Sequence, residues 1–267
     1  GLTPPYSLSA WTAGDVRVGT YSNAEAFIDV VNAHGIDKIF FNPGGEMIGL
    51  QSLIAQARVA GKKAPQLLLC LDESVAVSAA HGSYMISGKP QVILVHSELG
   101  TLQMGGNLQN IQWGRAPVVI LAAFQDDEQR TTWKGEPYDQ ACIVRGNMKW
   151  DRRIEDGEDL APILTEALQA ACTDPTGPVY LHFPFDYLAQ AAGGSDAPPA
   201  PADIAPLPPA DADALDRAAE ILLAAELPLL VTGMAGRRPS NVDALVRLAE
   251  TLCAPVLTGQ VWMNFPS

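Results

Sequence analysis

Short, continuously apolar segments alternate with helix-like segments through the first two thirds of the chain, and this alternation restricts the fold more than any other feature. The predicted strands cover residues 38–41, 66–71, 91–95, 118–123 and 179–183. The predicted helices begin at Ser22, where Glu25 completes a capping box, and continue over 47–60, 74–87, 102–113 and 160–172. Strands that are apolar on both faces are typical of parallel sheets covered by helices. We therefore predict an α/β fold with a doubly wound, mostly parallel sheet and helices on both faces.

Changes in composition divide the chain into four stretches. These are an irregular N-terminal arm, a first domain, a linker rich in Pro and Ala, and a final α/β stretch: 1–21, 22–188, 189–210 and 211–267. The last stretch has predicted helices and strands at 212–225, 228–232, 241–253 and 255–257. Because two strands rarely form an independent sheet, it is interpreted as the beginning of a second, Rossmann-like domain that is incomplete.

Composition excludes several classes of function. The formal net charge of -13 over 267 residues disfavours nucleic acid and anionic membrane surfaces as partners. No apolar run approaches the roughly 20 residues of a membrane span, and the N-terminus does not resemble a signal peptide. The four cysteines lie far apart, without metal-ligand or disulfide spacing, and are interpreted as reduced thiols. We expect a cytoplasmic protein.

Glu73 is the strongest candidate for a catalytic residue. It stands between the apolar strand that ends near Asp72 and a helix of small residues, 74–87. Burial of a carboxylate at such a junction favours its neutral form, so the group needs a partner and suits proton transfer. The alternative is that Glu73 only caps the helix, since negative charge is favourable at a helix N-terminus.

Two loops follow other strands of the predicted sheet, at the edge where open α/β sheets bind ligands. The turn at Gly44 and Gly45 lets a ligand approach the backbone closely, although it matches neither G-x-G-x-x-G nor a Walker sequence. The loop from His96 to Thr101 brings polar groups to the same edge. Ser97 lacks the flanking glycines of a nucleophile elbow, so hydrolase triad chemistry is not expected.

Several motifs occur in an order that resembles one family of enzymes. They are Pro43-Gly44-Gly45, Glu73 with Gly82 and Gly88-Lys89-Pro90, Gly100-Thr101 with Gly105-Gly106-Asn107, Arg115-Ala116-Pro117-Val118-Val119, Asp139-Gln140 with Lys149-Trp150, and Gly177-Pro178-Val179-Tyr180-Leu181. Together they resemble the pyrimidine-binding domain of thiamine diphosphate enzymes of the acetolactate synthase, pyruvate oxidase and benzoylformate decarboxylase type. The resemblance covers residues 22–188 and continues more weakly into the family's central domain.

The resemblance implies a catalytic role and a binding site. Glu73 would bind the aminopyrimidine of thiamine diphosphate and promote its activation, and the reaction would decarboxylate or ligate a 2-keto acid or related carbonyl compound. The implied cofactor-binding residues are Glu73, Pro43, Gly44, Gly45, His96, Ser97 and Gly100. The implied substrate pocket contains Glu98, Leu99, Thr101 and Gln112. No metal ligand is expected in this chain.

Two departures from the family pattern leave alternatives open. The Gly-Asp-Gly motif that holds Mg²⁺ and the diphosphate does not occur, so that domain would come from a partner chain or a missing part, in a homo- or hetero-oligomer. His96-Ser97-Glu98-Leu99 replaces the Thr-Ser-Gly-Pro usual in acetolactate synthases, which makes other decarboxylases and carboligases equal candidates. A thiamine diphosphate-dependent C–C hydrolase or oxidase, or a non-catalytic assembly subunit, are the alternatives. A bound FAD stays undetermined.

Overall fold

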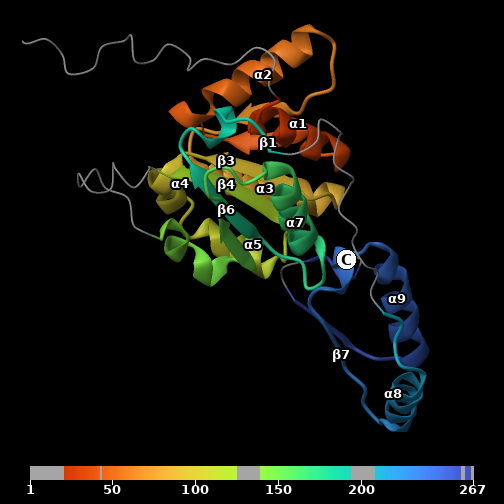
Figure 1. The fold of residues 1–267 in the computed structure, drawn as a ribbon. Coiled ribbons are helices and arrows are strands. Elements are labelled where there is room, and N and C mark those ends of the chain that lie inside the picture. Colours follow the sequence, from red (N-terminus) through yellow and green to blue (C-terminus); the bar gives the residue numbers. More distant parts are fainter. Residues whose placement is uncertain (1–20, 43, 125–138, 194–207, 260–261, 266–267) are drawn as a thin grey trace, which may run out of the picture. The chain divides into compact units, whose positions relative to one another are not determined.

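The computed structural model describes residues 21–42, 44–124, 139–193, 208–259 and 262–265 (Figure 1). The predicted N-terminal arm lies outside these residues except for Tyr21, as does most of the predicted linker. The chain divides into two compact units, Gly1–Ile204 and Ala205–Ser267. Each unit is described by itself.

The first unit is built on a six-stranded sheet whose pairs are all parallel (Figure 1). The strand order is β2-β1-β3-β4-β6-β5. The strands are β1 (Lys38–Phe41), β2 (Gln66–Leu69), β3 (Gln91–Val95), β4 (Val118–Phe124), β5 (Trp150–Arg153) and β6 (Val179–Pro184). β1 lies next to the edge strand β2, and the chain then returns to add β3 and β4 on the other side of β1, which confirms the predicted α/β fold.

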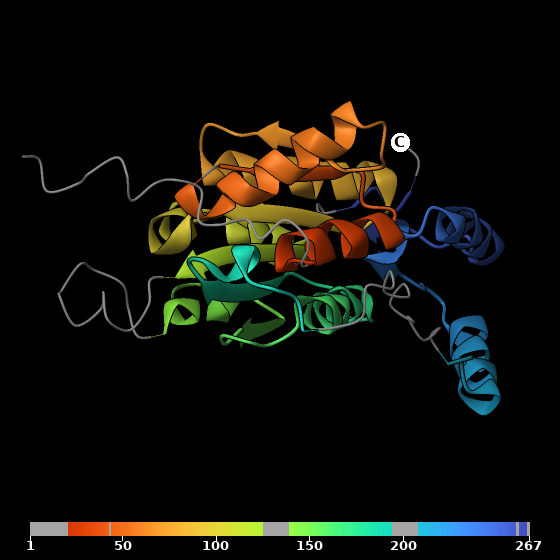
Figure 2. The same ribbon diagram turned by 45° about the horizontal axis from the view of Figure 1, so that its top comes forward.

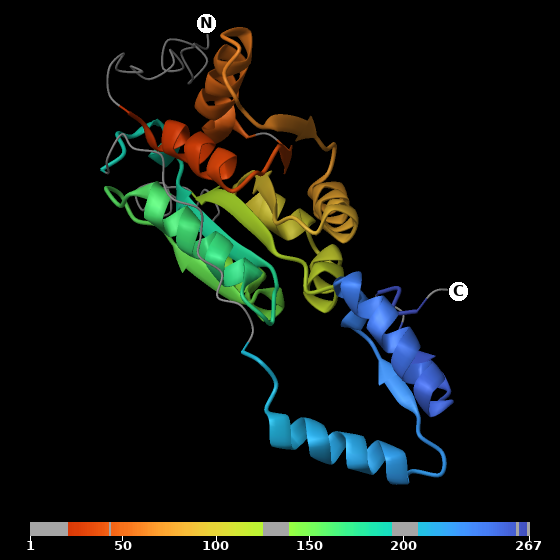
Figure 3. The ribbon, with the colours of Figure 1, turned by 90° about the vertical axis from the view of Figure 1, so that its right-hand side faces the viewer.

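Helices cover both faces of this sheet. They are α1 (Asn23–Ala33), α2 (Ile48–Val59), α3 (Glu73–Ser87), α4 (Ser97–Gln103), α5 (Asn107–Trp113) and α7 (Leu160–Cys172). Short 3-10 turns add η2 (Gly45–Met47), η3 (Gln140–Ile143), η4 (Arg145–Asn147) and η5 (Tyr187–Ala189). Figures 2 and 3 show α1 and α7 together on one face, and Figure 3 shows α3 and α5 on the other. The capping box is confirmed: the Ser22 side chain accepts from the Glu25 amide, and the Glu25 carboxylate accepts from the Ser22 amide.

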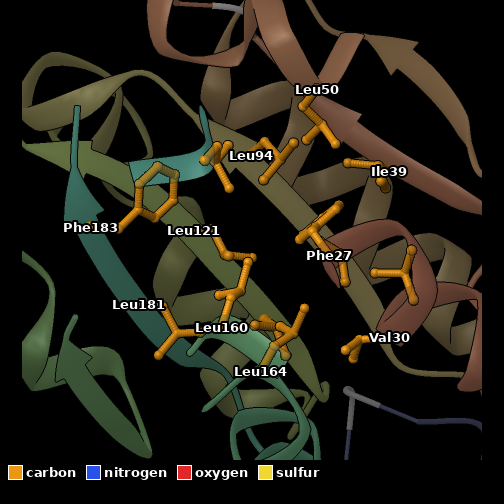
Figure 4. Close-up of a cluster of buried hydrophobic side chains, with 14 of the residues drawn as sticks. Phe27, Val30, Ile39, Leu50, Leu94, Leu121, Leu160, Leu164, Leu181 and Phe183 are labelled. Carbon is orange, nitrogen blue, oxygen red and sulfur yellow. The ribbon is translucent and has the colours of Figure 1, made fainter. Parts of the chain in front are cut away.

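One face of the sheet holds the main hydrophobic core. Alternate strand residues point to the same face, and here they meet the buried faces of α1 and α7 (Figure 4). The side chains labelled there are Phe27, Val30, Ile39, Leu50, Leu94, Leu121, Leu160, Leu164, Leu181 and Phe183. This packing fixes β1, β3 and β4 in the middle of the unit and so fixes the loops that follow them.

Two local predictions are wrong. The single helix predicted at 102–113 is two helices, α4 and α5, because Gly105 has φ +39°, a left-handed conformation that ends the first helix. Strand β5 was not predicted, because its sequence Trp-Asp-Arg-Arg is polar. It lies at the edge of the sheet, where it pairs only with β6 and charged side chains stay partly exposed.

The second unit contains α8 (Ala212–Ala224), β7 (Leu230–Thr232), η6 (Ala235–Arg237), α9 (Ser240–Leu252) and β8 (Val256–Thr258). Its two strands pair in parallel. Neither α8 nor α9 has a buried residue. The fold therefore agrees with an incomplete α/β domain. In the described parts of the chain, no helix has the length and apolar character needed to cross a membrane.

Candidate active site

The carboxyl edge of β1, β2 and β3 brings together three ionisable side chains from separate parts of the sequence. Glu46 lies in η2 after β1, Glu73 begins α3 after β2, and His96 caps α4 after β3. β1 pairs with both β2 and β3, so their carboxyl ends are neighbours. This is the edge at which open α/β sheets bind ligands.

Glu73 is buried, with 5% of its surface exposed. Among the described residues, no hydrogen bond to its carboxylate is formed, although a buried carboxylate normally has a partner. The N-cap of α3 is Asp72, whose side chain accepts from the Ser74 amide at 2.7 Å. The hydrogen bonds from the Ser74 hydroxyl and amide hold the pKa of Asp72 below its usual range. The side-chain cap is therefore Asp72, and Glu73 lies in the first turn of the helix, where its negative charge is also favourable.

Gly100 approaches the Glu73 carboxyl closely. A Cβ atom added at Gly100 would lie 2.8 Å from Oε1 of Glu73 and 3.2 Å from Cβ of Val95. Real Cβ atoms do not approach other atoms so closely, so a side chain here would displace the carboxyl. The backbone of α4 thus forms one wall against Glu73.

Glu46 and His96 form a hydrogen-bonded pair. Nδ1 of His96 lies 3.0 Å from each carboxylate oxygen of Glu46. The Glu46 side chain is fully buried and that of His96 is 35% exposed. Because an ionised carboxylate only accepts, Nδ1 carries the hydrogen, and Nε2 of a neutral His96 is the basic nitrogen.

The glycine turn lies against this pair. A Cβ atom at Gly44 would lie 2.2 Å from both Oε2 of Glu46 and Nδ1 of His96. Gly45 begins η2, and Pro43 lies outside the described residues. A side chain at Gly44 would therefore displace the Glu46 carboxylate or the His96 ring.

The first turn of α4 holds the next group of predicted residues. Ser97 is buried and has φ +28°, a strained value for a residue with a side chain. Thr101 is also buried, and its hydroxyl donates to the Ser97 carbonyl at 2.7 Å. Glu98 is half-buried, and Leu99 is 63% exposed.

Gln112 lies apart from these residues. It is near the end of α5, shortly before β4 begins. The strands of this parallel sheet begin at the edge opposite to the one where Glu46, Glu73 and His96 lie. Its Nε2 donates to the Gly146 carbonyl at 3.2 Å. The structure therefore brings Gly44, Gly45, Glu73, His96, Ser97 and Gly100 to one edge, and does not bring Gln112 there.

Glu46 is the site residue that the sequence analysis missed. It is 50 residues from His96 in the sequence. Its position in the sequence could have indicated it, because Glu46 directly follows the glycine turn. The carboxyl ends of adjacent parallel strands share one edge, so a residue after one strand can meet a residue after the next. Within the described ranges, no three His, Cys, Asp or Glu side chains gather as metal ligands.

Comparison with known proteins finds a matching family model and several similar enzymes. Residues 22–143 match the family model described as "Thiamine pyrophosphate enzyme, N-terminal TPP binding domain". The chain is 25% identical to the acetolactate synthase of Bacillus subtilis over 217 residues, which is 81% of this chain and 36% of that protein. It is 29% identical to the benzoylformate decarboxylase of Pseudomonas aeruginosa over 173 residues, 62% of this chain and 30% of that protein.

A solved structure shares the fold. The thiamine diphosphate-dependent 4-hydroxybenzoylformate decarboxylase of Rhodococcus jostii superimposes with a TM-score of 0.78 at 24% identity, covering 92% of this chain and 46% of that one. The chain thus spans about a third of the length of these two curated relatives and nearly half of this structure.

Proposed function

We propose that this chain, which belongs to the thiamine diphosphate-dependent enzymes, acts on 2-keto acids or related carbonyl compounds. Its family membership rests on the match over residues 22–143 and on the similar synthases and decarboxylases. The proposed reaction is decarboxylation, carboligation or both. The observation that carries the proposal is the Glu73 carboxyl, which is buried at the ligand-binding edge and has no hydrogen-bond partner among the described residues.

The residues at this edge fit the pyrimidine end of thiamine diphosphate. A buried carboxyl gains a partner when a ring nitrogen of the pyrimidine lies within hydrogen-bonding distance. Gly44 and Gly100 carry no side chains that would fill the space beside Glu46, His96 and Glu73. We assign pyrimidine binding to Glu73, Gly44, Gly45 and Gly100, with His96 and Ser97 beside them. The predicted role of Pro43 stays a prediction from the sequence, because this residue lies outside the described ones.

Thiamine diphosphate supplies, when bound, a carbon nucleophile that adds to a carbonyl and accepts the electrons released by decarboxylation. Glu73 would share a proton with the pyrimidine ring, which is general acid–base catalysis by a buried carboxyl. His96 would exchange a proton with the substrate through Nε2. The Glu46 carboxylate would stabilise the protonated ring from the Nδ1 side.

The substrate side of the site is proposed to involve Glu98, Leu99 and Thr101. Leu99 is exposed on α4 and offers an apolar contact to a substrate side chain. Glu98 brings an acidic group to the same turn, which would disfavour a second keto-acid carboxylate as acceptor. This favours a decarboxylase, or a carboligase with an uncharged acceptor, over acetolactate formation.

The diphosphate and its Mg²⁺ are proposed to be held by a domain outside this chain's residues. That domain would come from another subunit or from a further part of a longer protein. We therefore propose a homo- or hetero-oligomer of at least two chains, in which a chain carries the diphosphate-binding domain. The chain's limited coverage of its relatives is consistent with this division.

A product survey tests the proposal. The protein, in the assembly in which it is isolated, would be supplied with thiamine diphosphate, Mg²⁺ and either benzoylformate or pyruvate. We expect release of CO₂ with an aldehyde, or with a ligated product when an aldehyde acceptor is added. The Glu73→Gln variant is the control. Equal turnover by this variant would indicate a non-catalytic assembly subunit, and an oxidised or hydrolysed product would indicate the oxidase or hydrolase alternative.

A further inference from the structure

Three buried polar side chains form a hydrogen-bonded network that connects β4 and β6 to the first turn of α4. It contains Gln140 from η3, Tyr180 from β6 and Thr101 from α4. All three side chains are buried, and Gln140 is fully inaccessible. Polar side chains in a core that is otherwise apolar specify one arrangement when their hydrogen bonds are made.

The number of hydroxyl hydrogens fixes which group donates in each of these hydrogen bonds. Thr101 donates its single hydroxyl hydrogen to the Ser97 carbonyl, so the 2.7 Å bond between Thr101 and Tyr180 must have the Tyr180 hydroxyl as donor. The Tyr180 oxygen then accepts from Nε2 of Gln140 at 2.8 Å. The shorter bonds therefore run from Gln140 through Tyr180 and Thr101 to Ser97, and Nε2 of Gln140 also donates directly to the Thr101 hydroxyl at 3.4 Å.

The orientation of the Gln140 amide is fixed by β4. Its Nε2 also donates to the Ala123 carbonyl at 3.0 Å, and a carbonyl can only accept. Turning the amide over would lose that bond. The amide oxygen has no hydrogen-bond partner among the described residues, which destabilises the core. A glutamine held in this way anchors the chain to the centre of the sheet.

The other end of the chain is the strained turn of the proposed site. Ser97 has φ +28°, and its carbonyl is the acceptor of the Thr101 hydroxyl. Gly100, in the same turn, lies against the Glu73 carboxyl, and His96 caps the turn. A strained backbone persists when surrounding contacts hold it in place.

We propose that Gln140 and Tyr180 are positioning residues, which hold the first turn of α4 and thereby set Gly100 and His96 relative to Glu73. The hydrogen bonds described for these two side chains go to Ala123, to each other and to Thr101. The two residues act through Thr101 and Ser97. This role rests on the proposed function, because it concerns the geometry of that site.

The test compares two buried tyrosines. Tyr180→Phe removes the 2.7 Å bond to Thr101 and leaves the ring, together with the longer 3.4 Å contact between Gln140 and Thr101. Tyr187→Phe is the matched control, because Tyr187 is also fully buried and its hydroxyl donates to the Glu158 carbonyl at 2.8 Å, outside this chain of bonds. Gln140→Met, which keeps the length and removes both donors, is the second variant of the same network.

The first readout does not require the cofactor. Amide hydrogen exchange of residues 97–104 is measured by mass spectrometry in the full chain. We expect about fivefold faster exchange in Tyr180→Phe and Gln140→Met, the factor that corresponds to the loss of one net hydrogen bond. We expect no change there in Tyr187→Phe. Equal exchange of this segment in all variants would overturn the proposal.

The second readout separates positioning from a purely structural role. In the loaded assembly, kcat should fall at least about tenfold in Tyr180→Phe with KM nearly unchanged, because misplaced groups slow the reaction itself. Faster exchange with unchanged kcat would overturn the positioning role. If the unmodified assembly neither binds thiamine diphosphate nor turns over, the proposed function fails and the catalytic part of this inference fails with it. The exchange comparison still decides whether the network holds α4.

Discussion

The two buried carboxylates at the carboxyl edge of the sheet, Glu46 and Glu73, differ in what surrounds them. Both oxygens of Glu46 face His96 Nδ1 at 3.0 Å, so its hydrogen bonding is provided by the protein. The Glu73 carboxyl lies against Gly100 and receives no hydrogen bond from the described residues. The proposed roles follow this difference. Glu46 supports His96, and Glu73 receives its hydrogen-bond partner from a bound ligand.

The largest expected effect separates the two groups by activity. Glu73→Gln keeps the shape and removes the carboxyl that would share a proton with the cofactor. We expect turnover to fall by roughly 10²–10⁴-fold, the range for loss of a general acid–base group. The variant should unfold at the same urea concentration as the unmodified protein, since no described hydrogen bond is lost. Steady-state kinetics and urea unfolding of the same preparation check both parts.

The next effect concerns the wall beside Glu73. In Gly100→Ala the new methyl would lie 2.8 Å from Oε1 of Glu73 and should displace the carboxyl. We expect a loss of turnover up to about 100-fold, because small misplacements of a reacting group have large effects. The matched control is Gly82→Ala in α3, where an added Cβ meets nothing within 4 Å. This control should be stabilised by about 0.5–1 kcal/mol. A fully active Gly100→Ala would contradict the close approach to Glu73.

A smaller effect tests the pairing of Glu46. Glu46→Gln replaces a charged acceptor by a neutral one in the bond to His96. Hydrogen bonds to charged groups contribute roughly 1 kcal/mol more than neutral ones, so we expect a destabilisation of about 1 kcal/mol. Urea unfolding of Glu46→Gln measures this loss of stability, and Glu73→Gln, which makes the same chemical change at the other carboxylate, is measured for comparison. Equal midpoints for the two variants would remove the distinction between them.

The smallest effect comes from a carboxylate that has a partner and is exposed. Arg145 bonds Asp139 at 2.7 and 3.0 Å, and both side chains are half exposed. These bonds hold the pKa of Asp139 below its ordinary value of 3.8. Arg145 also bonds Asp151 at 2.9 Å, so the variant that isolates the first pair is Asp139→Asn. Because water screens an exposed pair, Asp139→Asn should lower stability by about 0.5 kcal/mol.

The pH dependence of that small effect has a definite sign. A lowered pKa in the folded state means that the contribution is fully present above 3.8. It is lost as the pH falls through the lowered value. The difference between Asp139→Asn and the unmodified protein should therefore shrink in acid, as measured by urea unfolding at several pH values. A difference that grows on acidification would contradict the assignment.

Much of the fold could be predicted from the sequence because its strands are buried on both faces. β1 and β3 are apolar after their first residues, Lys38 and Gln91, and the predicted bounds agree with the structure. β5 could not be found in this way, because an edge strand can expose charged residues such as Arg152. The break between α4 and α5 depends on the left-handed conformation of Gly105, which a helical pattern of apolar residues does not reveal.

The site was predictable where motifs are local and was missed where it depends on contacts across the sheet. Glu73 and Gly100 follow their strands directly, and the structure brings them together. Glu46 and Gln140 act through residues that lie about 40 or 50 positions away in the sequence. Pairing of this kind depends on strand order, and a single sequence does not determine which strands are neighbours.

The most direct test of the account is a calorimetric titration with thiamine diphosphate and Mg²⁺. The protein is used in the assembly in which it is isolated, with Glu73→Gln as the comparison. We expect saturable binding with one cofactor for each copy of this chain, and altered affinity in Glu73→Gln. Absence of binding to the unmodified assembly would contradict the assignment of Glu73 to thiamine diphosphate.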